Sequence, residues 1–286
     1  MVDIQEIDAP SCVLGEGPIY IDKLLYWIDI EGRLVHRLRL KDDQFHSFVM
    51  PSRPGCVVPR ASGGVAVALE DGIYSLNEEA GRVERLAHIP LRNQRLNDGK
   101  CDRLGRLWVG SMVLSGPKQT GSLYRVDPDL SVHTMLDGIT ISNGLAWSAD
   151  DKTLYYIDTP TGRVDAFDFD LESGSISNRR PVVEVPKELG FPDGMTIDAS
   201  GNLWVGLWAG GAVACFDPAT GKLLSKLTLP GTENVTCPTF GGPKFDHLYI
   251  TTARSSESDQ AKFPRGGRTF ASKVDAVGFV PNAFVG

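Results

Sequence analysis

The sequence repeats one short phrase, and this repeat limits the chain to folds built from copies of a single unit. The phrase begins with Asn or Asp beside Gly and continues, after a tight turn, with a Leu-aromatic strand. The clear copies are Asn97-Asp98-Gly99 with Leu107-Trp108, Asn143-Gly144 with Leu154-Tyr155, and Asp193-Gly194 with Leu203-Trp204. Such units are either stacked or arranged radially. In a radial arrangement, equivalent residues of every unit face the same axis.

Weaker copies bring the number of units to six, with starts near residues 16, 56, 97, 143, 193 and 237. This period is typical of four-stranded propeller blades rather than of shorter solenoid repeats. The sequence therefore predicts an all-β fold, a six-bladed β-propeller that forms a single domain over residues 1–286. We expect the segment from Ile4 to Val13 to complete the last blade, which closes the ring without an exposed sheet edge. In unit four, the alternating segment 164–170 predicts a half-exposed outer strand.

The amino-acid composition is typical of a fold with many short strands, and it argues against nucleic acid and membranes as partners. The chain of 286 residues contains 31 Gly and 18 Pro and has almost no long helical periodicity. Its net charge of −7 comes from interspersed charges without a basic stripe, which argues against nucleic acid as a partner. The sequence lacks an apolar run long enough to cross a membrane, so no membrane partner is expected.

The cysteines and the N-terminus together predict a cytoplasmic protein. The five cysteines are scattered, odd in number and without a CxxC pair, which favours buried, reduced thiols. The first residues lack the basic and apolar regions of a signal peptide. No pattern in the sequence indicates the oligomeric state.

Oxygen-bearing side chains occupy the same position in four of the six units. They are Glu16 in unit one, Asn97 with Asp98 in unit three, Asn143 in unit four and Asp193 in unit five. Any one of them alone is better explained as a turn former, because Asn-Gly and Asp-Gly tolerate left-handed backbone. Their common register, and the lack of an equivalent in units two and six, favour a shared site at the axis.

Carboxylates gathered at one axis repel one another unless a cation neutralises them. Carboxylate and amide oxygens suit a hard divalent ion such as Ca²⁺, Mg²⁺ or Mn²⁺, and Zn²⁺ also accepts carboxylates. The sequence therefore predicts one divalent metal ion in the central channel. Other catalytic templates fit poorly, because the five histidines share no register and no G-x-S-x-G elbow precedes a helix.

Six segments spread along the chain match one known family. They are Leu14-Gly15-Glu16-Gly17-Pro18, Arg95-Leu96-Asn97-Asp98-Gly99-Lys100, Gly121-Ser122-Leu123-Tyr124, Ile141-Ser142-Asn143-Gly144-Leu145-Ala146-Trp147-Ser148, Tyr156-Ile157-Asp158-Thr159 and Phe191-Pro192-Asp193-Gly194-Met195. With these motifs, essentially the whole chain resembles the gluconolactonase family, also called the senescence-marker-protein or regucalcin family. The motifs are specific as a set, whereas Pro-Asp-Gly or Asn-Gly alone is a weak signal.

The resemblance implies a six-bladed propeller with one catalytic divalent metal in its channel. Carried over by position, it implies Glu16, Asn143 and Asp193 as metal ligands. It also implies that Arg95 and Asn97 bind a sugar lactone, with Asp98 nearby.

One position departs from the pattern of the family. The family commonly places a glutamate a few residues after a Gly-(Ser/Thr)-Met stretch, whereas here Gly110-Ser111-Met112 is followed by Val113-Leu114-Ser115. This departure concerns the choice of substrate and leaves the predicted metal ligands intact.

The leading hypothesis is a metal-dependent lactonase that hydrolyses an aldonolactone, such as a glucono-, galactono- or pentonolactone, to the aldonic acid. In this hypothesis Asp193 is a ligand and also the general base or proton shuttle. Two alternatives stay open: a hydrolase of organophosphates or phosphofluoridates, and a calcium-binding propeller without catalysis. The polar loops 114–120 and 255–268 are candidates for the rim of the pocket. The strand registers of the tryptophans favour the core, and Trp208 is the one candidate to line the pocket instead.

Overall fold

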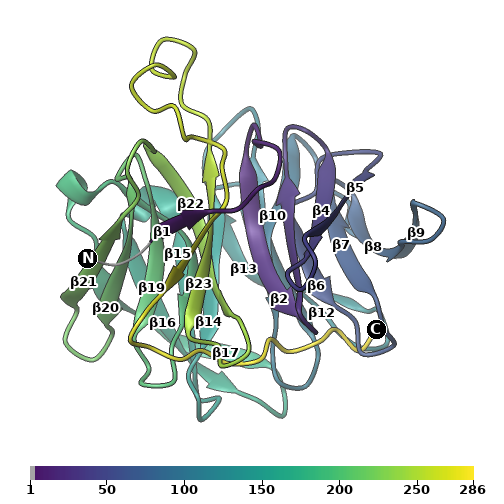
Figure 1. Cartoon of the computed structure of the whole chain (residues 1–286). Coiled ribbons are helices and arrows are strands. Elements are labelled where there is room, and N and C mark those ends of the chain that lie inside the picture. Colours follow the sequence, from purple (N-terminus) through teal and green to yellow (C-terminus); the bar gives the residue numbers. More distant parts are fainter. Residues whose placement is uncertain (1–3) are drawn as a thin grey trace.

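The computed structural model describes residues 4–286. Each repeat unit folds into one four-stranded antiparallel sheet, and six such sheets surround a common axis (Figure 1). Blade 1 consists of β2 (Gly15–Ile21), β3 (Leu24–Asp29), β4 (Leu34–Arg39) and β5 (Gln44–Val49). Blade 2 consists of β6 (Cys56–Pro59), β7 (Val65–Leu69), β8 (Gly72–Asn77) and β9 (Arg82–His88). Blade 3 consists of β10 (Gln94–Cys101), β11 (Leu107–Val113), β12 (Gly121–Val126) and β13 (Val132–Ile139).

The later blades follow the same plan. Blade 4 consists of β14 (Ser142–Trp147), β15 (Thr153–Asp158), β16 (Arg163–Asp170) and β17 (Ser175–Glu184). Blade 5 consists of β18 (Phe191–Ile197), β19 (Leu203–Trp208), β20 (Ala212–Asp217) and β21 (Lys222–Thr228). Blade 6 contains β22 (Asn234–Gly241), β23 (His247–Ala253) and β24 (Phe270–Lys273), and the short 3₁₀ helices η1 (Thr159–Thr161) and η2 (Lys187–Leu189) lie in loops. The predicted all-β, six-bladed propeller is confirmed.

The two ends of the chain meet in blade 6. Strand β1 (Ile4–Glu6) pairs antiparallel with β24, with Ile4 opposite Ser272 and Glu6 opposite Phe270. The inner strands β2 and β22 also contact each other, which completes the ring. The N-terminal segment therefore supplies the fourth strand of blade 6, as the sequence predicted.

The outer strand of blade 4 was predicted wrongly. The alternating segment 164–170 belongs to β16, which is the third strand, and the outer edge is β17. Asp165 in this segment is only 1% exposed and is paired with two arginines. Its carboxylate accepts from Arg163 and Arg179, each at 2.7 Å. A charged residue can occupy a buried strand position when it is paired in this way.

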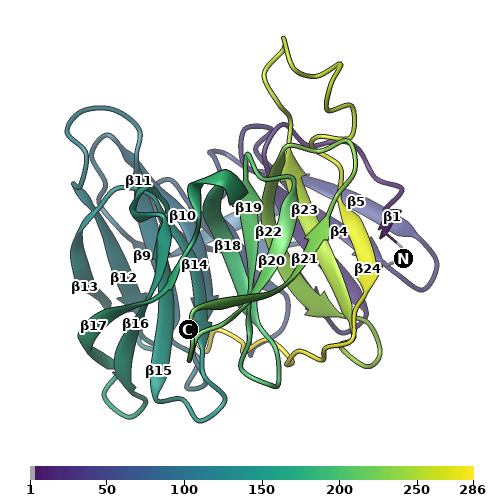
Figure 2. The same ribbon diagram turned by 90° about the vertical axis from the view of Figure 1, so that its left-hand side faces the viewer.

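A C-terminal strap, residues 274–286, runs along one end of the propeller, opposite the projecting loop between β23 and β24 (Figures 1 and 2). It ties blade 6 to blades 2 and 3: Gly278 N donates to Phe245 O at 2.9 Å, and Phe284 N donates to Pro59 O at 2.8 Å. The Phe284 side chain is fully buried among the hydrophobic residues between blades 2 and 3. Among the described residues, no helix has the length and apolar character needed to cross a membrane.

Candidate functional site

The site residues proposed from the sequence lie where the inner strand of each blade departs from regular pairing. The pairing shifts occur between Glu16 and Ile19 in β2, Leu96 and Gly99 in β10, Asn143 and Leu145 in β14, and Pro192 and Met195 in β18. A β-bulge releases a residue from the ladder and turns its side chain in a new direction. The repeated bulge is therefore the local feature that lets four blades present polar side chains at the axis.

The glycines after Asp98, Asn143 and Asp193 are required by close packing around the axis. A Cβ on Gly144 would lie 2.7 Å from the Cβ of Met195, and a Cβ on Gly194 would lie 2.4 Å from the Sγ of Cys237. Gly99, Gly144 and Gly194 are all within strands and have ordinary backbone angles. The turn-former explanation of the Asn-Gly and Asp-Gly pairs is therefore wrong for these copies. Glycine is needed because neighbouring inner strands approach closely at the axis.

A cavity of about 370 Å³ occupies one mouth of the channel and brings most of the proposed residues together. Its polar lining comprises Glu16, Arg95, Asn97, Asn143, Thr159 and Asp193. Its apolar lining comprises Leu14, Ile30, Met112, Ile141, Pro160, Phe191 and Trp208. Trp208 lines the pocket, which bears out the alternative given for it rather than a core position. The loops 114–120 and 255–268 contribute no lining residue, so the expectation that they form its rim is not met.

A chain of hydrogen bonds orients the polar half of the cavity. Arg95 Nη1 donates to Asn97 Oδ1 at 2.6 Å, and Asn97 Nδ2 donates to Asn143 Oδ1 at 3.0 Å. Asn143 Nδ2 then donates to Thr159 Oγ1 at 2.8 Å, and that hydroxyl donates to Pro192 O at 2.8 Å. Sequence reasoning quoted Thr159 only as part of a motif and missed this role. Its hydroxyl connects blade 4 to the backbone beside Asp193.

The carboxyl groups of Glu16 and Asp193 interact in this cavity. Burial, followed by the neighbouring negative charges, raises the pKa of both groups, and their side chains are hydrogen-bonded to each other. Arg95 opposes this shift, and burial lowers the pKa of its guanidinium to about 10. In the absence of a cation, the Glu16–Asp193 pair therefore tends to hold a proton.

Asp98 does not line the cavity and is buried close to the two other carboxyl groups. Its Oδ1 accepts from Gly99 N at 2.8 Å, while its Oδ2 is buried without a hydrogen-bond partner among the described residues. Burial raises the pKa of this carboxyl as well. The carboxyl groups of Glu16 and Asp193 and the amide of Asn143 line the cavity together, and carboxylate and amide oxygens are the ligands that a hard divalent ion prefers.

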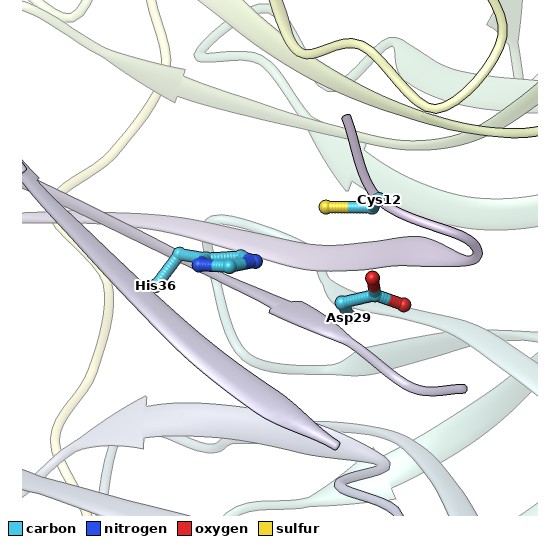
Figure 3. A group of neighbouring side chains, drawn as sticks. All are labelled: Cys12, Asp29 and His36. Carbon is cyan, nitrogen blue, oxygen red and sulfur yellow. The ribbon is translucent and has the colours of Figure 1, made fainter. Parts of the chain in front are cut away.

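A second group of potential ligands, Cys12, Asp29 and His36, is buried in blade 1 (Figure 3). The oxygens of Asp29 already accept from Val13 N at 2.9 Å and from Leu14 N and Gly32 N at 3.0 Å. Asp158 at the equivalent end of β15 accepts in the same way from the loop before β14. Asp29 therefore has a structural role: its carboxylate accepts hydrogen bonds from the loop before its blade, as that of Asp158 does in blade 4.

Comparison with known proteins agrees with the fold and the motifs. The family model described as "SMP-30/Gluconolactonase/LRE-like region" matches residues 14–254. The Bacillus subtilis protein named "Putative sugar lactone lactonase YvrE" is 34% identical over 280 residues, which cover 96% of each chain. Human regucalcin is 35% identical, with 100% of this chain and 99% of that protein covered. The crystal structure of a calcium-binding protein, regucalcin from Agrobacterium tumefaciens, has a TM-score of 0.93 at 26% identity, covering 99% of this chain and 97% of that chain.

Proposed function

The chain belongs to the SMP-30/gluconolactonase/LRE-like family, and from this premise we propose that it is a metal-dependent hydrolase that opens an aldonolactone to its aldonic acid. The observation that supports this most strongly is the convergence of two buried carboxyl groups and an amide in one cavity. A binding platform without chemistry has no evident need for such an arrangement. The sugar lactonase name of the Bacillus subtilis relative agrees with this proposal.

In this proposal Glu16, Asn143 and Asp193 hold one divalent ion, which is Ca²⁺, Zn²⁺, Mg²⁺ or Mn²⁺. When bound, such an ion polarises an ester carbonyl and lowers the pKa of water. The guanidinium of Arg95 and the amide of Asn97 position the lactone, and Asp98 adds negative charge close to the ligands. The five buried free thiols support a reducing compartment such as the cytoplasm, where we place the protein.

The reaction consumes one water molecule. Its oxygen forms a bond to the carbonyl carbon, and the bond from that carbon to the ring oxygen breaks. The carboxylate of Asp193 accepts the proton of the attacking water and passes it to the ring oxygen as that oxygen leaves. The product is the open hydroxy acid.

The test is hydrolysis of glucono-, galactono-, xylono- and arabinolactone by metal-stripped protein, followed with a pH indicator. Each of the four ions is added back separately. We expect one ion to restore turnover well above spontaneous opening, and Asp193→Asn to abolish it. Asp168→Asn, at an exposed position on β16, is the matched control and should retain activity. Metal binding without lactone turnover would favour the calcium-binding alternative, and turnover of an organophosphate alone would favour the phosphoester alternative.

A further inference from the structure

The hydrogen bonds between the polar residues of the cavity run in a single direction. Arg95 lies at one end of the chain, and a guanidinium group can only donate hydrogen bonds. The carbonyl oxygen of Pro192 lies at the other end and can only accept. Each group between these ends therefore accepts on the side of Arg95 and donates on the side of Pro192. This direction decides which way the side-chain amides of Asn97 and Asn143 face.

The orientation of the Asn97 amide follows from its contact with Arg95. Because Nη1 of Arg95 donates to Oδ1 of Asn97 at 2.6 Å, the amide nitrogen of Asn97 points away from the guanidinium. This nitrogen donates to Ser142 O at 2.7 Å and to Asn143 Oδ1 at 3.0 Å, so both of its N–H groups are in use. Asn143 must present its oxygen to Asn97, because its nitrogen would place two donors against each other.

Thr159 fixes the other half of the Asn143 amide. The Thr159 hydroxyl donates its one proton to Pro192 O at 2.8 Å, so it can only accept from Asn143. Nδ2 of Asn143 donates to this oxygen at 2.8 Å. The backbone of Thr159 is itself held in place, because its N–H donates to Ile141 O at 3.1 Å at the start of η1. Asn143 is only 4% exposed, so loss of this acceptor would leave a buried N–H group unsatisfied.

From this geometry we propose that Thr159 is a positioning residue of the metal site, whose hydroxyl makes Oδ1 of Asn143, and not Nδ2, the atom available to a cation. This inference rests on the function proposed above, in which Asn143 is a ligand. A hard cation binds an amide through its oxygen, and the N–H groups of the amide are donors that cannot bind it. The same hydroxyl also holds the carbonyl group of the residue before Asp193. One side chain therefore orients one proposed ligand and restrains the backbone beside another.

Metal binding by Thr159 variants tests this role without relying on turnover. Isothermal titration of the metal-stripped wild type with Ca²⁺, Zn²⁺, Mg²⁺ and Mn²⁺ identifies the ion that binds most tightly, and this ion is the probe for the variants. Thr159→Val keeps the shape of the side chain and removes the hydroxyl, so we expect its Kd for the ion to rise by about 10–100-fold. Thr159→Ser retains the hydroxyl and should bind almost as tightly as the wild type.

Thr161→Val is the matched control for the loss of a hydroxyl. Thr161 lies in the same 3₁₀ helix, but its hydroxyl donates to Asp158 O at 2.7 Å and the residue lies outside the cavity lining. Its substitution should leave the Kd unchanged. At saturating ion, Thr159→Val should recover most of the turnover of the wild type, since it retains every proposed ligand. A loss of turnover that excess ion does not restore would contradict a role limited to holding the amide.

A second background separates the orientation of the amide from the packing of the side chain. Asn143→Asp replaces the amide by a carboxylate, whose two oxygens are equivalent, so that either of them can face the ion. Thr159→Val should therefore weaken binding much less in this background than in the wild type, and a double-mutant cycle measures the difference. Equal losses in both backgrounds would show that Thr159 acts through packing alone.

The outcomes separate this inference from the function on which it rests. An unchanged Kd in Thr159→Val would overturn the positioning role and leave the lactonase function standing. Metal binding that Thr159→Val weakens, in a protein that hydrolyses no lactone, would support the positioning role and contradict the lactonase function. A wild type that binds none of the four ions would overturn the proposed metal site and this inference with it.

Discussion

The buried carboxyl groups of Glu16 and Asp193 lower the stability of the metal-free protein at neutral and higher pH. Burial and neighbouring charge raise the pKa of both carboxyl groups. A carboxyl group whose pKa is higher in the folded than in the unfolded chain contributes stability at low pH. That contribution is lost as the pH rises through the folded pKa. A bound divalent ion would offset this loss, so the residues proposed to hold the ion would also make the stability of the protein depend on it.

The first prediction at the residue scale concerns the stability of Asp193→Asn. At pH 8 this variant removes one of the mutually repelling buried charges, so we expect the metal-free variant to be more stable than the metal-free wild type. The gain should be at least about 1.4 kcal/mol, the equivalent of one pKa unit. Urea unfolding of both proteins in a chelator measures it, with Asp168→Asn as the exposed control. A less stable variant, or one that Ca²⁺ stabilises as strongly as the wild type, would contradict the proposed role of Asp193.

The second prediction concerns His36 on β4, which is 2% exposed and packs against Trp27. Burial lowers the pKa of His36 to about 4, so the folded protein holds this imidazole neutral. Because the unfolded chain takes up a proton near the ordinary histidine pKa of about 6.5, stability falls as the pH decreases from there towards 4. We expect this side chain to account for about 2 kcal/mol of lost stability between pH 7 and pH 5.

Urea unfolding of wild type and His36→Gln at pH 7 and pH 5 tests this prediction. The variant should be less stable at pH 7, where it loses the contact of Nδ1 with Ser47 Oγ, and its stability should depend less on pH. His46→Gln, at an exposed position on β5, is the control and should keep the pH dependence of the wild type. An unchanged pH dependence in His36→Gln would show that the imidazole does not titrate as described.

At the scale of single elements, the turn inside the repeat is held by an aspartate. Asp198 accepts from Ser200 N, Asn202 N and Trp204 Nε1, each at 2.9 Å. Asp102 makes the corresponding bond to Trp108 Nε1 at 2.9 Å in blade 3. The spacing between the aspartate and the Leu-Trp strand is therefore a consequence of one hydrogen-bonded turn, which explains why the phrase recurs.

We expect Asp198→Ala to destabilise the protein by about 1–3 kcal/mol, since it leaves the buried N–H of Trp204 without an acceptor and an unsatisfied buried donor costs that much. Thermal and urea unfolding measure the loss. Asp150→Ala, at the exposed turn of blade 4, should change stability much less. Equal effects of the two substitutions would show that the buried turn is not what holds the repeat.

The sequence predicted blades and register better than it predicted the role of individual polar residues. The period of the phrase identified six blades, because it follows directly from the strand pattern along the chain. The alternation in β16 was misleading because Arg179, from the next strand, covers Asp165. The close packing at Gly144 was not foreseen either, because it involves Met195 in the next blade, some fifty residues away.

For the whole molecule, closure of the ring decides whether a site exists at all. Glu16 lies in blade 1 and Asp193 in blade 5, and blade 6 between them is completed by both ends of the chain. A loosened junction would therefore separate the carboxyl groups before any single blade unfolds. The C-terminal strap also links the blades: at the end of the propeller opposite the loop between β23 and β24, it connects blade 6 to blades 2 and 3.

The last prediction tests this strap through Phe284, whose side chain is fully buried. Phe284→Ala should lower the free energy of unfolding by about 3–5 kcal/mol, as large-to-small changes of aromatic core residues do. Val280→Ala lies in the same strap but at a side chain that is 71% exposed, so it should have little effect. Urea unfolding measures both variants. A small effect of Phe284→Ala would mean that the strap packs on the ring without securing it, and that β1 with β24 alone holds the propeller closed.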